Sequence, residues 1–235
     1  MIVTLVVASF IQSIGGFGSA LVATPILLTF LNRPTAFSSL LASGTVLGAF
    51  LVWRISGPVS VRVVGQLVAA ALVGMPIGLL ILIRTPIEPL KVVVGFLAIV
   101  LACLAFRWRS LPSSRRLLAL AGVSSGALQT STTMSGPPVV LLLAGSDMGR
   151  DEIRKTLQVY FLCLNVISLP LFFAASLLNA RGTALGVASV PFVLAAGNFG
   201  NWTVRFISRE RFRILALAIV VAAGAVGIAS ALRSG

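Results

Sequence analysis

The strongest constraint on this chain is a series of apolar stretches, about 20 residues each, joined by short polar connections. A stretch of this length, wound as an α-helix, crosses the hydrocarbon core of a bilayer, which is about 30 Å thick. Only 10% of the 235 residues are charged, whereas a soluble domain carries about 25%. The sequence therefore predicts an all-α polytopic integral membrane protein, with residues 1–235 forming a single membrane domain.

Two of the apolar stretches contain residues that interrupt helices. The first, QSIGGFGSALVATPILL, runs from Gln12 to Leu28, and the second, QTSTTMSGPPVVLLL, runs from Gln129 to Leu143. Glycine permits non-helical backbone, and proline removes a backbone donor. Open backbone at membrane depth is tolerated only where protein buries it or where it lines a cavity. We therefore expect a binding site where these two broken units lie.

The broken units also mark an internal repeat. Aligning Pro25 with Pro138 matches Pro-Ile-Leu-Leu to Pro-Val-Val-Leu, and each unit is followed by further apolar spans. We predict repeat 1 over residues 1–106, a polar connection over 107–116, and repeat 2 over 117–235. The expected spans after the broken units are 36–53, 61–83 and 90–106 in repeat 1, and 156–178, 182–204 and 215–232 in repeat 2. Residues 145–155 are expected to form a charged loop.

The topology of the broken units decides how the repeats are related. If both units span the membrane, there are eight spans, the repeats are parallel, and the basic residues divide ten against eight. If both units enter and return as hairpins, there are six spans, the repeats are inverted, and the division is thirteen against five. Cytoplasmic loops carry an excess of Lys and Arg. Charge therefore favours six spans, with the side that carries thirteen facing the cytoplasm.

The chemistry of the broken units points to an anion. Pro25, Pro137 and Pro138 favour helix starts, and a helix N-terminus offers free N–H groups with about half a positive charge. Neutral polar side chains around these starts suit the oxygens of a small oxyanion. The predicted site residues are Gln12, Ser13, Gly16, Gly18, Ser19, Thr24 and Pro25 in the first unit, and Gln129, Thr130, Ser131, Thr132, Thr133, Ser135, Gly136, Pro137 and Pro138 in the second. Asn165 shares a predicted helical face with Gln158 and joins this set. The alternative is that these small residues only allow close helix packing.

Missing residue types exclude several functions. The chain has no His, and its five acidic residues all fall in predicted loops or at span ends. This composition offers no catalytic triad and no cluster of metal ligands, so we expect no enzyme activity, no cofactor and no metal. The net charge of +13 is explained by the topology of the loops, so nucleic acid is not an expected partner. Expected partners are the anion, membrane lipid and, as an option, a second copy in a homodimer.

The two broken units also resemble the signature segments of a known family. Gly16-Phe17-Gly18-Ser19-Ala20 with Pro25-Ile26-Leu27-Leu28, and Ser135-Gly136-Pro137-Pro138 with Val139-Val140-Leu141-Leu142, are similar to the two signatures of the TauE/SafE family. The resemblance covers nearly the whole chain. It implies an integral membrane permease for sulfite, sulfonates or related sulfur anions, in a bacterial-type inner membrane. Members are commonly described with seven or eight spans, which is more than the six that charge favours.

These observations lead to one functional expectation and two alternatives. We expect a secondary permease that moves a small sulfur-containing anion, of the sulfite or organosulfonate class, across the inner (plasma) membrane. Alternating access between two repeats is the expected mechanism. The alternatives are an anion channel built from the same residues and a structural or assembly subunit that transports nothing.

Overall fold

All the regular secondary structure in the described part of the chain is helical. The computed structural model describes residues 1–86, 114–143 and 146–203, with scattered positions in 89–100 and 206–229. Its helices are α1 (Ile2–Gly15), α2 (Ser19–Phe30), α3 (Arg33–Arg54), α4 (Val61–Arg84), α6 (Arg115–Thr132), α7 (Gly136–Leu143), α8 (Arg150–Ala174) and α9 (Ala180–Thr203). No strand occurs among these residues. Only scattered positions of the predicted spans 90–106 and 215–232 are described, and most of the connection 107–116 lies outside the described residues.

Four of these helices are long and apolar enough to cross a membrane: α3, α4, α8 and α9. Each has 22 to 25 residues, which corresponds to about 33–38 Å of helix. In contrast, α1, α2 and α7 have 14, 12 and 8 residues, so none of the three can span the hydrocarbon core alone. The prediction of an all-helical membrane protein with two broken units is confirmed at this level.

One predicted boundary is wrong. The sequence placed residues 145–155 in a charged loop, but α8 begins at Arg150. Arg154 therefore lies in the helix, and only 5% of its surface is exposed. Arginine is almost never fully buried unless it is paired. The sequence prediction therefore assigned Arg154 to a loop because of its charge, whereas the structure buries it within α8.

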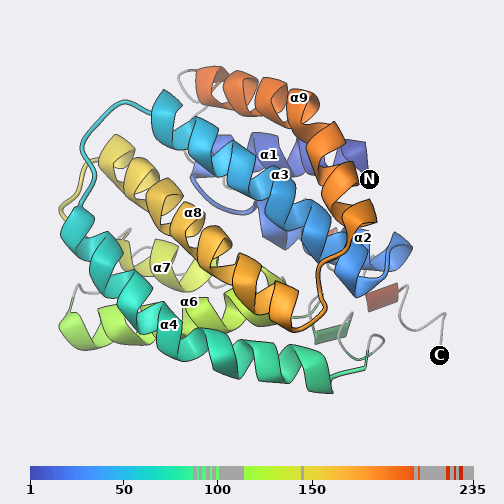
Figure 1. Ribbon diagram of the computed structural model, residues 1–235. Helices are drawn as coiled ribbons and strands as arrows, with labels where there is room; N and C mark the ends of the chain where they lie inside the picture. Colours follow the sequence, from blue (N-terminus) through green and yellow to red (C-terminus); the bar gives the residue numbers. More distant parts are fainter. Residues whose placement is uncertain are drawn as a thin grey trace.

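Close contacts at glycines give the directions of the long helices. On α9, Gly182 lies against Thr35 and Gly186 against Ser39 of α3, so these two helices are parallel. On α3, by contrast, Gly44 lies near Asn165 and Gly48 near Leu162, so α3 and α8 are antiparallel. Figure 1 shows α8 in the centre of the molecule, with α3 and α9 on one side and α4 and α6 on the other.

The chain turns back on itself between α6 and α8. The Tyr160 hydroxyl donates to Ser125 Oγ at 2.8 Å, and Gln129 Nε2 donates to Asn165 Oδ1 at 3.0 Å. Residue numbers thus rise together on α6 and α8, which makes these helices parallel. The segment between them, which contains α7, must therefore return toward the level at which α6 began.

Two buried apolar clusters hold the helices together, and each draws on both halves of the chain. The first combines α1, α2 and α3 with residues of α9 such as Val193. The second combines α6, α7 and α8 with residues of α4 such as Leu67. In each cluster a broken unit and the helix that follows it pack against a long helix from the other half. Neither half can therefore bury its broken unit without the other.

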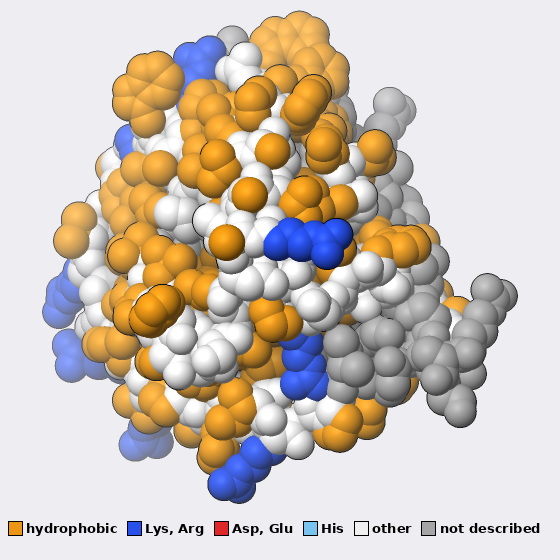
Figure 2. All heavy atoms as spheres, turned by 45° about the vertical axis from the view of Figure 1, so that its right-hand side comes forward, with side chains coloured by type: hydrophobic (Ala, Val, Ile, Leu, Met, Phe, Trp, Pro, Cys, Tyr) orange, Lys and Arg blue, Asp and Glu red, His pale blue; other side chains and the backbone are white. Residues whose placement is uncertain are grey.

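The outer surface is mainly apolar. Large hydrophobic side chains such as Val73, Ile77 and Ile81 on α4 and Phe173 on α8 are exposed. Figure 2 shows hydrophobic side chains over much of one face, with Lys and Arg at a few separate places. Such a surface suits contact with lipid tails, and it would promote aggregation in water.

The contact between α4 and α6 depends on glycine. Gly74 and Gly78 on α4, and Gly122 and Gly126 on α6, are each spaced four residues apart, as in the small-xxx-small packing of membrane helices. A Cβ at Gly74 would lie 1.9 Å from the Val123 carbonyl oxygen, and one at Gly126 would lie 2.2 Å from that of Ala71. The two backbones touch, so there is no room for a larger residue.

We expect Gly126→Ala to lower the free energy of unfolding by about 1–3 kcal/mol, because the added methyl group forces the helices apart. Gly65→Ala is the matched control, since a Cβ at Gly65 of α4 meets no atom within 4 Å. That variant should be as stable as the wild type or slightly more stable, because alanine favours helix. Thermal unfolding in detergent measures both, and equal midpoints for the two variants would contradict the packing described here.

Candidate functional site

The first break is made by two glycines in a left-handed conformation. Gly16 has φ 79° and ends α1, with its N–H donating to the Gln12 carbonyl at 2.7 Å. Gly18 has φ 105° and precedes α2, which begins at Ser19. Other residues are strained at such angles, so glycine permits the sharp bend. The prediction that Pro25 marks a helix start is wrong, because Pro25 lies inside α2.

The second break has the same plan with different residues. Thr133 ends α6 with φ 61°, and its N–H donates to the Gln129 carbonyl at 3.1 Å. A β-branched residue with positive φ is unusual and costs energy, so its surroundings must hold it there. The Thr133 hydroxyl lies 2.7 Å from that of Thr24 and 2.6 Å from the Thr132 carbonyl oxygen. The first of these contacts joins the two broken units directly.

Equivalent positions in the two breaks are separated by a constant 117 residues. The terminal carbonyls belong to Gln12 and Gln129 (129 − 12), the left-handed caps are Gly16 and Thr133 (133 − 16), and the next helices begin at Ser19 and Gly136 (136 − 19). The alignment of Pro25 with Pro138 implies 113, so it is shifted by about one helical turn. The correspondence between the two breaks therefore follows their helix ends and helix starts, and not the alignment of the prolines.

One face of α8 contacts both breaks. Gln12 Nε2 donates to Gln158 Oε1 at 3.1 Å, and Gln158 Nε2 donates to the Gly16 carbonyl oxygen at 2.9 Å. Seven residues further on, Asn165 accepts the bond from Gln129 described above. The sequence predicted that Gln158 and Asn165 share a helical face. The structure adds that each meets one broken unit.

Arg154 lies one turn before Gln158 on the same face. It donates to the Ser13 carbonyl oxygen at 2.5 Å, near the end of α1, and to Asn201 Oδ1 on α9 at 3.0 Å. It also pairs with Asp151 at 3.2 Å. A cation at the C-terminal end of a helix interacts favourably with the helix dipole. Arg154 thereby ties α1, α8 and α9 together behind the first break.

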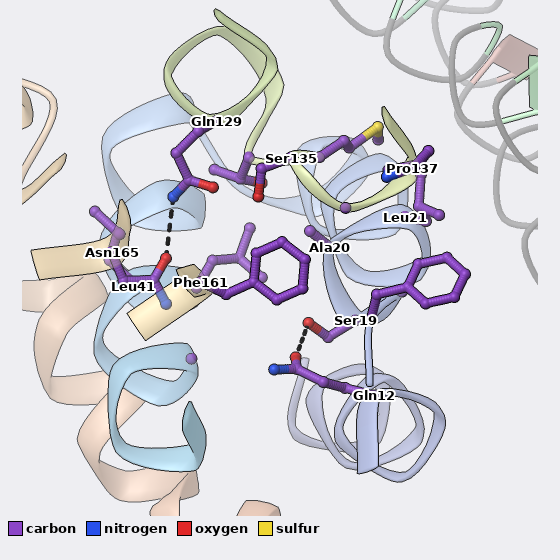
Figure 3. Close-up of a pocket in the computed structure, with 17 residues that line it drawn as sticks. Gln12, Ser19, Ala20, Leu21, Leu41, Gln129, Ser135, Pro137, Phe161 and Asn165 are labelled. Carbon is purple, nitrogen blue, oxygen red and sulfur yellow. Dashed lines mark hydrogen bonds between the residues drawn. The ribbon is translucent and has the colours of Figure 1, made fainter. Parts of the chain in front are cut away.

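A cavity of about 60 Å³ lies between the two breaks. It has room for roughly four to six water-sized groups, which is the size of a small oxyanion. Its lining comes from α1, α2, α3, α6, α7 and α8 and from both breaks. Figure 3 shows Gln129 and Asn165 on one side of this space, Gln12 and Ser19 on the other, and Phe161 projecting between them. No lining residue carries an acidic or basic side chain.

Nine of the predicted site residues line this cavity, and eight do not. Those that line it are Gln12, Gly18, Ser19, Gln129, Thr133, Ser135, Gly136, Pro137 and Asn165. Those outside are Ser13, Gly16, Thr24, Pro25, Thr130, Ser131, Thr132 and Pro138.

Hydroxyl groups outside the cavity are used within the protein. Ser13 donates to the Ser9 carbonyl, Ser131 to that of Ala127 and Thr132 to that of Leu128. Thr130 donates to the Met75 carbonyl on α4 at 2.7 Å, which fastens α6 to α4. A hydroxyl has a single hydrogen, so these groups have no further proton to offer a ligand. The rich hydroxyl content of the second unit therefore mostly serves packing.

The lining also includes apolar residues that sequence analysis did not identify. These are Phe17, Ala20, Leu21, Leu40, Leu41, Met134 and Phe161, together with Gly44. Inside an apolar chain, nothing in the sequence distinguishes them from residues that face lipid or the core. At Gly44 the backbone of α3 comes close to the Asn165 side chain of α8, since a Cβ at Gly44 would lie 3.3 Å from Asn165 Nδ2.

The two helices that begin at the cavity differ in what they offer an anion. Ser19, Ala20 and Leu21 open α2 and line the cavity, and α2 has no side-chain cap. The first N–H groups of a helix have no intrahelical partner, so all three can donate to a ligand. In α7 the second and third residues are Pro137 and Pro138, which have no N–H. That helix contributes its dipole and the Gly136 N–H.

Comparison with known proteins adds a family. Residues 1–226 match the family described as Sulfite exporter TauE/SafE. Searches of curated proteins and of solved structures found no match. The match covers the broken units, the four candidate spans and nearly all of the remaining sequence. The chain, a membrane protein with a cavity of neutral polar and apolar residues between two broken helices, belongs to the TauE/SafE sulfite exporter family.

Proposed function

We propose that this protein is a secondary permease that moves a small sulfur-containing anion, such as sulfite or an organosulfonate, across the inner membrane. One observation carries the proposal: the N-termini of α2 and α7 converge on a cavity whose polar lining groups are all neutral. The two helix N-termini together supply partial positive charge, and no acidic side chain of the described residues lines the cavity to neutralise it. Half-helix N-termini at membrane depth are the usual means by which transporters hold an anionic substrate group.

Neutral hydrogen-bond donors suit a transported anion, because the anion must be released after it has been bound. A buried lysine or arginine in the cavity would bind an anion strongly and slow its release, whereas amide, hydroxyl and backbone groups bind more weakly. The Asn165 amide, the Ser135 hydroxyl and the first N–H groups of α2 are the proposed donors. The remaining wall is apolar and excludes water, which strengthens each of these hydrogen bonds.

We further infer that the two halves are inverted repeats, each opened by a hairpin. Helices α3 and α8 follow the two broken units and are antiparallel, which supports a two-fold axis in the membrane plane. The chain turns back between the parallel helices α6 and α8, as a hairpin requires. In this arrangement thirteen of the 18 basic residues belong to one side, and twelve remain there when the buried Arg154 is left out, which agrees with the excess of Lys and Arg in cytoplasmic loops.

Inverted halves suggest how access alternates. The cavity lies where the broken units of the two halves meet, and each unit packs against a long helix from the other half. In the proposed cycle, one half tilts against the other and opens the cavity to one side at a time. The substrate crosses with little movement of its own. A multi-pass protein in the inner membrane, surrounded by lipid and free to pair as a homodimer, completes the proposal.

The hairpin arrangement predicts that Val3 and Phe30, which flank the first unit, face the same side of the membrane, with Ser56 on the other side. Single cysteines at these positions can be tested with a membrane-impermeant thiol reagent, after Cys103 and Cys163 are replaced by alanine. Val3→Cys and Phe30→Cys should react from the same side, because α1 and α2 together return the chain. Reaction of Val3→Cys and Phe30→Cys from opposite sides would mean that the unit crosses the membrane.

Removing donors from the cavity should weaken anion binding. We expect Asn165→Ala and Ser135→Ala each to raise the dissociation constant for sulfite by about tenfold to a hundredfold, because a hydrogen bond to a charged group contributes about 1.5–3 kcal/mol. Ligand-induced thermal stabilisation of the purified protein measures affinity, and flux into proteoliposomes measures transport. Ser124→Ala is the control, since that hydroxyl bonds the Leu120 carbonyl on the outer side of α6.

These measurements also separate the alternatives. Sulfite-dependent stabilisation with saturable flux supports the permease, whereas conductance without saturation indicates a channel. A protein that binds no anion would be a structural or assembly subunit, and wild-type affinity in both cavity variants would reject this site.

The affinity for a permanently ionised sulfonate should not depend on pH. No residue that lines the described cavity carries an acidic, basic, thiol or phenol group, so nothing in it changes charge between about pH 5.5 and 8.5. We expect equal methanesulfonate affinity across this range. Sulfite itself can vary, because its own ionisation changes. A steep pH dependence with methanesulfonate would show that a titratable group acts on the site.

A further inference from the structure

A second, smaller cavity adjoins the first. It measures about 20 Å³ and lies between α1, the start of α2, and α3, with room for about one water-sized group. Gln12, Ser19, Leu40 and Gly44 line both cavities, so the two are immediate neighbours. The other residues that line the second cavity are Leu5, Ala8, Ser9, Ala23, Ser43 and Leu47.

Four polar residues line the second cavity, and three of them are serines whose hydroxyl hydrogens are already committed. Ser9 Oγ donates to the Leu5 carbonyl at 2.6 Å, and Ser43 Oγ donates to the Ser39 carbonyl at 2.7 Å. Ser19 Oγ donates to Gln12 Oε1. Each hydroxyl therefore keeps only its lone pairs for any occupant. The three serines thus offer acceptors to the second cavity, whereas the proposed donors Asn165 and Ser135 line only the first.

We propose that the second cavity binds a sodium ion that is transported together with the anion. Hydroxyl and amide oxygens are hard ligands, and sodium sites beside the broken helices of transporters use neutral oxygens. Divalent cations normally require carboxylates, which this cavity does not contain. The apolar residues of the wall, such as Leu5 and Leu47, exclude water from the site. This inference rests on the proposed anion site.

In this proposal, the negative charge of the bound anion takes the role that a carboxylate side chain would otherwise have in balancing the sodium ion. A cation surrounded only by neutral groups at membrane depth is strongly disfavoured, and a nearby opposite charge offsets that cost. With an anion in the first cavity, the opposite charge lies just beyond Gln12 and Ser19. Each ion then favours binding of the other, and this coupling is reciprocal. The pair crosses the membrane with less net charge than the anion alone.

The test measures anion affinity in different salts. For the purified wild-type protein in detergent, we expect the dissociation constant for sulfite to be at least about tenfold lower in sodium than in potassium or choline, with chloride as the common counter-ion. Binding of radioactive sodium should rise when sulfite is added. Equal sulfite affinity in the three salts would overturn the proposal. If anion binding fails in all salts, the proposed function fails, and absent sodium binding in the same experiment overturns this inference separately.

Matched variants locate the effect. Ser9→Ala with Ser43→Ala removes two of the proposed ligands, and we expect it to abolish the sodium effect while leaving sulfite affinity in choline unchanged. Ser39→Ala is the control, because that buried hydroxyl bonds the Ala36 carbonyl on the same helix and lines neither cavity. Thermal midpoints without ligand show whether the variants fold. A sodium effect that persists in the double variant would overturn this location.

Discussion

The structure depends on satisfying backbone groups where helices break inside an apolar protein. Each break leaves carbonyl oxygens without their helical partners, and an unpaired carbonyl at membrane depth costs several kcal/mol. Side chains from neighbouring helices supply the missing donors. Arg154 and Gln158 of α8 bond the carbonyls of Ser13 and Gly16, and Ser125 of α6 bonds that of Ser135. These bonds allow the breaks, and the breaks create the cavity.

The two breaks share a geometry but differ in what they provide. Glycine makes the first bend at no strain and leaves the first N–H groups of α2 available to a ligand. Thr133 makes the second bend at a cost, and hydrogen bonds hold it in place. The prolines that follow remove two donors from α7. The proposed anion site is therefore asymmetric: its backbone donors come mainly from the first half, and its side-chain donors from the second half, which includes α8.

Each broken unit packs against a long helix from the other half, which explains why the cavity lies where the two halves meet. Helices α1, α2 and α7 are each too short to span a membrane alone, and each broken unit is buried partly by a long helix from the other half. Glycine contacts between α4 and α6, and between α3 and α9, bring the backbones together in this arrangement. Movement of one half against the other then necessarily changes the space between the broken units. In the proposed cycle, binding and conformational change therefore share one location.

The sequence by itself determined the class of protein, the positions of three of the four long helices and the existence of two breaks, because hydropathy, glycine and proline act locally. The boundaries of α3, α4 and α9 agree with the predicted spans within about three residues. Sequence also brought together Gln12, Gln129 and Asn165, because polar residues stand out in an apolar chain. Only the tertiary structure decided which hydroxyls face the cavity, since a serine that bonds its own helix has the same sequence signature as one that faces a ligand. It also decided that Arg154 is buried and that Phe161 and Gly44 border the site, because these depend on contacts between segments more than 100 residues apart.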